Sequence, residues 1–384
     1  MKDGWEYKKL GEICFIERGG SPRPIQQYIT NRADGLNWIK IGDAVEGSKY
    51  INSTKEKIIP EGLKKTRFVH KGDFILSNSM SFGKPYILGI DGCIHDGWLV
   101  IRDNNKIFDK TFLYYLLSSP NMYQEFKRLA VGGVVNNLNS NLVRNVVVPI
   151  PPLAEQERIV AELDLLSSII DKKKAQLKEY DQLAQSIFYT MFGDPITNEK
   201  GWKVKKLGEV GTIVGGSTPS TNDDSNWDGT INWVTPAELG EQLYYGETIR
   251  KLTEMGARGL TMMPAGTVLL SSRAPIGKLA ITTTPMCCNQ GFKNIICDKI
   301  INNVFLYYYL KNTMDLVKAL GRGATFKEVS KSAISSFKVP LPPLPLQQEF
   351  ASKVEAIERQ KSLIQQSIVE TQTLFDSRME HWFN

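Results

Sequence analysis

The sequence predicts an α+β protein in which two globular, mostly-β domains are separated by two long antiparallel helices, with a pseudo-two-fold internal repeat. Three observations predict this: the chain repeats itself about 190 residues apart, each copy begins with strand-like runs, and each copy ends with an unbroken helical pattern. The predicted boundaries are a first domain at 1–152, a spacer helix and linker at 153–198, a second domain at 199–343 and a second helix at 344–384.

The repeat follows the same order in both halves. GWEYKKLGE returns as GWKVKKLGE, IERGGSPRP as IVGGSTPST, and KGDFILSNSMSFGKPYIL as AGTVLLSSRAPIGKLAIT. Further along, FLYYLL matches FLYYYL and VVVPIPPLAEQ matches FKVPLPPLPLQ. Solenoid repeats are far shorter than this, so the pattern indicates one domain-sized unit used twice.

The first part of each copy reads as a β domain. Short β-branched and aromatic runs such as DFILSNS and WLVIR alternate with Gly, Pro and Asn, which favours strands joined by turns. FLYYLLSSP and its copy are the best helix candidates within the domains. We expect Trp38 and Trp233 to anchor the core rather than to stack on bases.

The last part of each copy reads as a long helix. Neither Gly nor Pro occurs at 153–192, and apolar residues alternate at spacings of four and three, the pattern of a coiled-coil seam. Each helix of about 40 residues would be about 60 Å long, and antiparallel pairing would bring the end of the chain back to its start. The expected seam residues are Ile159, Leu163, Leu166, Ile170, Leu177, Phe350, Val354, Ile357, Ile364 and Ile368.

Composition excludes several classes of protein. The five cysteines form no C-x-x-C pair and their number is odd, which argues against a zinc ribbon or a disulfide framework and favours buried free thiols in a reducing cytoplasm. No apolar run is long enough to cross a bilayer, so we expect a cytoplasmic protein without membrane contact. The net charge of +6 only weakly favours a polyanionic partner.

Catalytic motifs are missing from the sequence. The double prolines do not form the Asn- or Asp-Pro-Pro-aromatic motif of an adenine methyltransferase, and a phosphate-binding loop would need glycine where Asn78 and Ser272 stand. The three histidines are scattered, and HDG at 95–97 has the copy NQG at 289–291. We predict no catalytic residue, no metal site and no cofactor on this chain.

Two related domains on a fixed spacer would suit a split, asymmetric sequence of double-stranded DNA, because two-fold readers use half-sites about 34 Å apart. Polar and basic side chains at matching loops are the candidate contacts, although for each an idle surface or a turn-capping role stays open. The candidates are Arg18, Arg23, Lys40, Lys64, Lys65, Arg67, Ser77, Asn78, Ser79, Lys84, His95, Asp96, Ser271, Ser272, Arg273, Lys278, Asn289 and Gln290.

This organisation resembles the specificity (S) subunit of type I restriction–modification enzymes. The matching features are W-x-x-x-x-L-G-E at each domain start, G-G-S-P and G-G-S-T-P just after it, I-G-K in the second domain, and V-P-x-P-P-L before each long helix. Two departures stand out: Leu346 replaces Glu155 in the second helix start, and S-F-G-K replaces P-I-G-K in the first domain.

The resemblance implies two target-recognition domains and a chain that is not itself a catalyst. It also implies two modification (methyltransferase) subunits that carry S-adenosylmethionine and methylate adenine, and restriction (endonuclease) subunits that cleave DNA. The alternative is a scaffold whose two interaction domains, on a coiled-coil spacer, bind no nucleic acid. The bases read, the spacer length and the coupling to cleavage are not readable from the sequence.

Overall fold

The computed structural model describes residues 2, 4–45, 47–78, 83–130, 138–273, 275–321 and 328–384. Internal contacts divide the chain into two compact units, one of Met1–Lys173 with Gln366–Asn384 and the other of Lys174–Gln365. Each unit combines one mostly-β domain with segments of both long helices, α5 (Leu153–Phe192) and α9 (Leu344–Phe383). The predicted fold class is confirmed.

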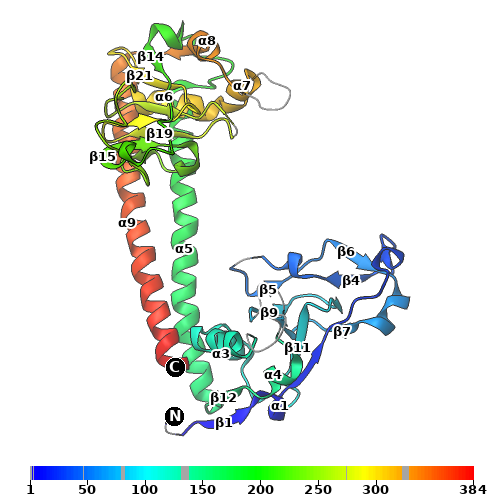
Figure 1. Ribbon diagram of the computed structural model, residues 1–384. Coiled ribbons are helices and arrows are strands. Elements are labelled where there is room, and N and C mark those ends of the chain that lie inside the picture. Colours follow the sequence, from blue (N-terminus) through cyan, green and yellow to red (C-terminus); the bar gives the residue numbers. More distant parts are fainter. Residues whose placement is uncertain are drawn as a thin grey trace. The chain divides into compact units, whose positions relative to one another are not determined.

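The first unit contains two five-stranded sheets and an antiparallel ribbon (Figure 1). The sheet orders are β2-β11-β8-β9-β5 and β3-β6-β4-β10-β7, and the ribbon pairs β1 with β12. Continuous apolar runs form the central strands β8, β9 and β11, which are buried along almost their whole length. The elements are β1 Glu6–Lys9, α1 Leu10–Ile13, β2 Phe15–Arg18, η1 Ile25–Gln27, β3 Ile29–Thr30, β4 Leu36–Ile39, β5 Tyr50–Ile51, β6 Glu56–Ile58, β7 Arg67–Val69, β8 Phe74–Ser77, β9 Pro85–Leu88, β10 Gly92–Ile94, β11 Trp98–Arg102, α2 Lys110–Ser118, α3 Pro120–Ala130, α4 Ser140–Arg144 and β12 Val147–Ile150.

The second unit repeats this topology. Its five-stranded sheet, β14-β21-β18-β19-β16, matches the first sheet strand for strand, the three-stranded sheet β17-β15-β20 matches part of the other, and β13 pairs with β22. The helices α2 and α6 contain the two predicted helical segments. The elements are β13 Lys203–Lys206, β14 Gly211–Val214, β15 Trp227–Val234, β16 Tyr244–Tyr245, β17 Lys251–Leu252, β18 Val268–Leu270, β19 Leu279–Thr282, β20 Cys287–Cys288, β21 Asn294–Cys297, α6 Asn303–Asn312, α7 Met314–Ala319, α8 Lys331–Ser336 and β22 Lys338–Leu341.

Within each unit the segments of α5 and α9 pair antiparallel. In the first unit Lys173 Nζ donates to Ser367 Oγ at 2.6 Å, while farther along the two helices Glu162 pairs with Arg378. In the second unit Lys361 Nζ lies 2.7 Å from an Asp181 carboxylate oxygen. Residue numbers therefore rise along one helix as they fall along the other.

The predicted seam residues differ in how deeply they are buried. Those nearest the β domains lie in the hydrophobic cores of the units, whereas all but one of those toward the helix centres are half-buried, the exception being the buried Ile170. The buried residues are Ile159, Leu163, Ile170, Phe350, Val354 and Ile357, and the half-buried ones are Leu166, Leu177, Ile364 and Ile368.

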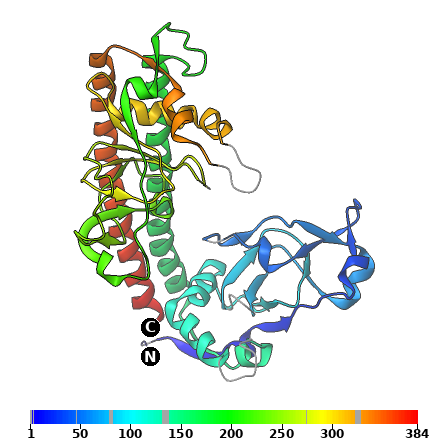
Figure 2. The ribbon, with the colours of Figure 1, turned by 45° about the horizontal axis from the view of Figure 1, so that its top comes forward.

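The two ends of the chain lie together in the first unit, as Figure 1 and Figure 2 show. The ammonium group of Lys2 lies 3.0 Å from the Trp382 carbonyl oxygen and 4.8 Å from the centre of the Trp382 ring. In the second unit the indole N–H of Trp202 donates to the Phe192 carbonyl oxygen at 3.0 Å. Each domain therefore starts beside the end of a long helix.

A buried glutamine joins the start of each long helix to its domain. Gln156 donates to the Pro151 and Ile107 carbonyl oxygens and accepts from the Asp109 N–H at 2.8 Å. Gln347 donates to the Pro342 and Ile300 carbonyl oxygens and accepts from the Asn302 N–H at the same distance. Both side chains are at most 1% exposed, which explains the glutamine after each V-P-x-P-P-L segment.

Candidate nucleic-acid interface

The Gly-Gly pair after the first strand of each domain permits a close backbone approach. A Cβ on Gly19 would lie 2.2 Å from the His95 carbonyl oxygen, and one on Gly216 would lie 1.8 Å from the Cys288 carbonyl oxygen. The N–H of Gly19 donates to the Trp98 carbonyl oxygen. The glycines thus let the loop pack directly against the backbone of the neighbouring strand and turn. The Gly19 N–H is hydrogen-bonded within the domain and does not point to a phosphate.

The HDG and NQG turns have the same hydrogen bonds in both domains. His95 Nδ1 accepts from the Gly97 N–H at 2.9 Å, and Asn289 Oδ1 accepts from the Gly291 N–H at 2.9 Å. The first polar residue of each turn therefore closes the turn, whichever side chain supplies the acceptor. This is the turn-capping role that the sequence had left open. The remaining polar atoms of the two side chains, an imidazole nitrogen in His95 and an amide nitrogen in Asn289, differ between the domains.

The second residue of each turn binds a hydroxyl of the Gly-Gly loop. Ser21 Oγ donates to Asp96 Oδ1 at 2.8 Å, and Thr218 Oγ1 lies 2.6 Å from Gln290 Oε1. The same framework thus carries a carboxylate in one domain and an amide in the other. Those two groups differ in charge and in hydrogen-bonding capacity, as base readers of different specificity require.

Asp96 is the electrostatic centre of the first domain's loops. His95 Nε2 lies 2.9 Å and Arg23 lies 3.7 Å from its carboxylate oxygens. Partial burial acts to raise the Asp96 pKa, but the Ser21 hydrogen bond and the neighbouring His95 and Arg18 outweigh it and hold the pKa below its usual value. Burial lowers the pKa of His95, more than Asp96 raises it. At neutral pH the loop therefore presents a carboxylate beside a neutral imidazole.

Four candidate contacts are corrected by the structure. Ser77, Asn78, Ser271 and Ser272 are at most 1% exposed, so their side chains cannot meet a DNA groove as they stand. The two hydroxyls of Ser77 and Ser271 accept from the N–H groups of the loop lysines, at 3.0 and 2.8 Å, and thereby hold the loop. Ser79, the fifth residue of this group, lies outside the described residues.

Most of the basic candidates already have a partner. Lys40 pairs with Glu56 at 2.7 Å, Arg67 with Glu17 at 2.5 Å and Arg273 with Glu328 at 2.8 Å. Such partly exposed pairs are worth at most about 1 kcal/mol, so a phosphate can replace the carboxylate at little cost. The other basic candidates are Arg18, which donates to the Asp96 carbonyl oxygen, Lys65, which contacts Tyr28, the exposed Lys64 and Lys84, and the half-buried Lys278.

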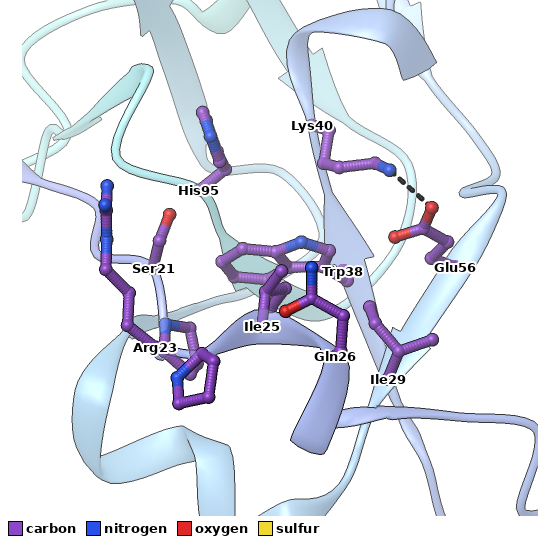
Figure 3. Close-up of a pocket in the computed structure, with 11 residues that line it drawn as sticks. Ser21, Arg23, Ile25, Gln26, Ile29, Trp38, Lys40, Glu56 and His95 are labelled. Atoms are coloured by element: carbon purple, nitrogen blue, oxygen red, sulfur yellow. Dashed lines mark ion pairs between the residues drawn. The ribbon is translucent and has the colours of Figure 1, made fainter.

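A pocket of about 870 Å³ opens beside these loops in the first domain (Figure 3). Trp38, which is 1% exposed, forms its floor, and Ile25 and Ile29 contribute apolar walls. Figure 3 shows the ion pair of Lys40 and Glu56 on one side of the indole. Sequence reasoning missed Ile25 because a single apolar residue in a short 3-10 turn, η1, forms no motif.

An aromatic pair occupies the matching region of the second domain. Trp227 and Trp233 meet edge to face with ring centroids 5.1 Å apart. The guanidinium carbon of Arg250 lies 3.5 Å from the Trp227 ring centre, within cation–π distance. Trp233 is 3% exposed and Trp38 is 1% exposed, so the prediction that both anchor the core is confirmed.

The cysteines lie mostly inside the domains. All five cysteines are free, four are buried, and burial raises the pKa of Cys288 to about 12. Among the described residues, no three His, Cys, Asp or Glu side chains gather to hold a metal ion. No helix in this part of the chain is long and apolar enough to span a membrane.

A family model for the type I restriction modification DNA specificity domain matches residues 2–179 and 199–372. The MjaIX specificity subunit of Methanocaldococcus jannaschii is 40% identical over 159 residues, which cover 40% of this chain and 37% of that relative. The MjaX specificity subunit of the same organism, named as putative, is 25% identical over 93% of this chain and 88% of its own length.

A solved chain from a study of complex assembly and conformational transition in a type I R-M system has the same fold. Its TM-score is 0.65, with 23% sequence identity over 100% of this chain and 98% of the other. The family model, unlike this structural likeness, matches the two halves of the chain separately, in agreement with the internal repeat.

Proposed function

The chain belongs to the type I restriction–modification DNA specificity family, and from this premise we propose that each β domain reads one half of a bipartite, asymmetric DNA target. The paired segments of α5 and α9 set the number of unread bases between the half-sites. The chain selects the target and catalyses no reaction.

One observation carries the proposal beyond the family assignment. The two domains repeat the same turn and loop hydrogen bonds, yet His95 and Asp96 stand where the second domain has Asn289 and Gln290. A conserved framework with exchanged polar side chains is what two readers of unlike half-sites need. Exposed lysines such as Lys64 would add sequence-independent attraction to phosphates.

The partners follow from the same proposal. Two modification subunits bind the helices, one per pseudo-symmetric half, and they hold S-adenosylmethionine and methylate adenine within the selected target. Restriction subunits join this assembly and cleave DNA. The internal repeat supports two equivalent binding positions, because the glutamine-anchored helix starts at Gln156 and Gln347 are alike.

Selection of binding sites from a random duplex library tests the proposal. The full chain is purified with its modification subunit, and the bound sequences are determined at two salt concentrations, because phosphate contacts alone weaken with salt without sequence preference. We expect two short conserved blocks separated by a fixed unread interval. Binding without any preference among duplexes would instead support a scaffold that reads no DNA.

A further inference from the structure

The pocket of the first domain lies where the second domain holds an aromatic ring. Trp38 pairs with Cys93 and Trp233 pairs with Cys287, and each tryptophan is the third residue of an equivalent segment, 36–38 or 231–233. Asn37 pairs with Lys57 as Asn232 pairs with Lys251. Glu56 and Arg250, the residues just before those lysines, therefore occupy matching positions.

In the second domain, Trp227 contacts the elements that match the pocket walls. Its ring packs on Trp233, faces Arg250, and its indole N–H donates to the Ser220 carbonyl oxygen in the loop after the Gly-Gly pair. In the first domain the smaller Ile29 stands at this position, because Ile29 pairs with Ile58 as Trp227 pairs with Leu252, and Ile29 lines the pocket. A planar bicyclic ring fills the site in one domain, and a pocket remains in the other.

We propose that this pocket binds a nucleotide, with a planar base between Ile25 and the Lys40–Glu56 pair and a phosphate near Arg23. The inference deepens the proposed DNA-reading function, since the nucleotide that this surface would meet is one unstacked from a bound duplex. A volume of about 870 Å³ is ample for one base, and pockets of this size are typical of small-ligand sites.

The polar groups suit the edge of a base. Gln26 lines the pocket and is exposed, and its amide can both donate to and accept from a base edge. Lys40 and Glu56 add a donor and an acceptor on one side of Trp38, while Arg23 lies on the other side, as Figure 3 shows. The Arg23 side chain is 82% exposed and lies 3.7 Å from Asp96, so a phosphate at the rim can replace this weak ion pair at little cost.

The test fills the pocket with the ring that the second domain uses. Ile29→Trp places the ring at the position of Trp227 and closes the space, and Ile29→Val keeps it open as the matched control for a changed residue at this position. The full-length chain is titrated with a duplex carrying a single bulged 2-aminopurine and with the fully paired duplex. The four deoxynucleoside monophosphates are examined separately by saturation-transfer NMR, which distinguishes a free nucleotide from a nucleotide within DNA.

We expect the unaltered chain and Ile29→Val to prefer the bulged duplex by about tenfold, because stacking of one base has this order of effect, and Ile29→Trp to lose the preference. Monophosphate signals lost only in Ile29→Trp, without a bulge preference, would assign a free nucleotide as the ligand. Equal behaviour of all three chains with both probes would overturn the proposal. The same chains are also tested, together with the modification subunit, for sequence-selective binding of fully paired DNA. This second measurement tests the proposed DNA-reading function separately from the nucleotide pocket.

Discussion

The buried glutamines give the most quantitative prediction of this structure. Gln156→Ala removes three hydrogen bonds, to the Pro151 and Ile107 carbonyl oxygens and from the Asp109 N–H. A buried hydrogen bond contributes about 1 kcal/mol net, so the loss is about 3 kcal/mol, and it grows because three backbone groups are left unpaired. The free energy of unfolding of the first unit should fall by at least this amount.

Urea unfolding followed by circular dichroism measures this loss, and amide exchange at Asp109 locates it. Gln347→Ala should cost the second unit a similar amount, and the double variant should show both losses added, because the sites share no partner. Gln366→Ala is the matched control, since its exposed side chain donates to Glu370 on the same helix surface. A loss below about 1 kcal/mol for Gln156→Ala would refute the anchoring role.

Three further predictions concern the loops and the thiols. Burial lowers the His95 pKa, so the neutral ring stabilises the fold above pH 6.5, and this stability should be lost as the pH falls through the lower folded pKa. His95→Asn should remove this acid sensitivity from the melting temperature, and a pH profile that the substitution leaves unchanged would contradict the prediction. Lys64→Ala should lower the salt slope of DNA binding by about one, whereas Lys172→Ala on α5 should not, and equal slopes would place Lys64 away from phosphate. Burial raises the pKa of Cys288 to about 12, so iodoacetamide at pH 8 should label it only after unfolding, and rapid native labelling would show an accessible thiol.

Long-range repetition made the architecture readable from the sequence. The segments FLYYLL and FLYYYL lie in α2 and α6, and the unbroken apolar pattern after the double prolines forms α5 and α9. Helix periodicity predicts which face is buried, but not how deeply. Ile159 is fully buried in the core of its unit, whereas Leu177, with the same spacing pattern, is half-buried and belongs to neither core.

The loop residues were harder to interpret because polarity does not reveal exposure. Ser77 and Ser271 looked like groove contacts, yet their hydroxyls accept from loop N–H groups inside the domain. The pocket beside Trp38 depends on the pairing of distant strands, and no local motif encodes it. Only the strand pairing shows that Trp227 of one copy stands at the position of Ile29 in the other.

Exchange of one domain tests the central claim most directly. Residues 1–152 are replaced by the same region of a relative with a different specificity, and methylated adenines are mapped across the genome of a host that carries the modification subunit. The account predicts that one half of the methylated target changes while the other half and the interval between them stay the same. A simultaneous change in both halves, or an unchanged target, would contradict the assignment of one half-site to each domain.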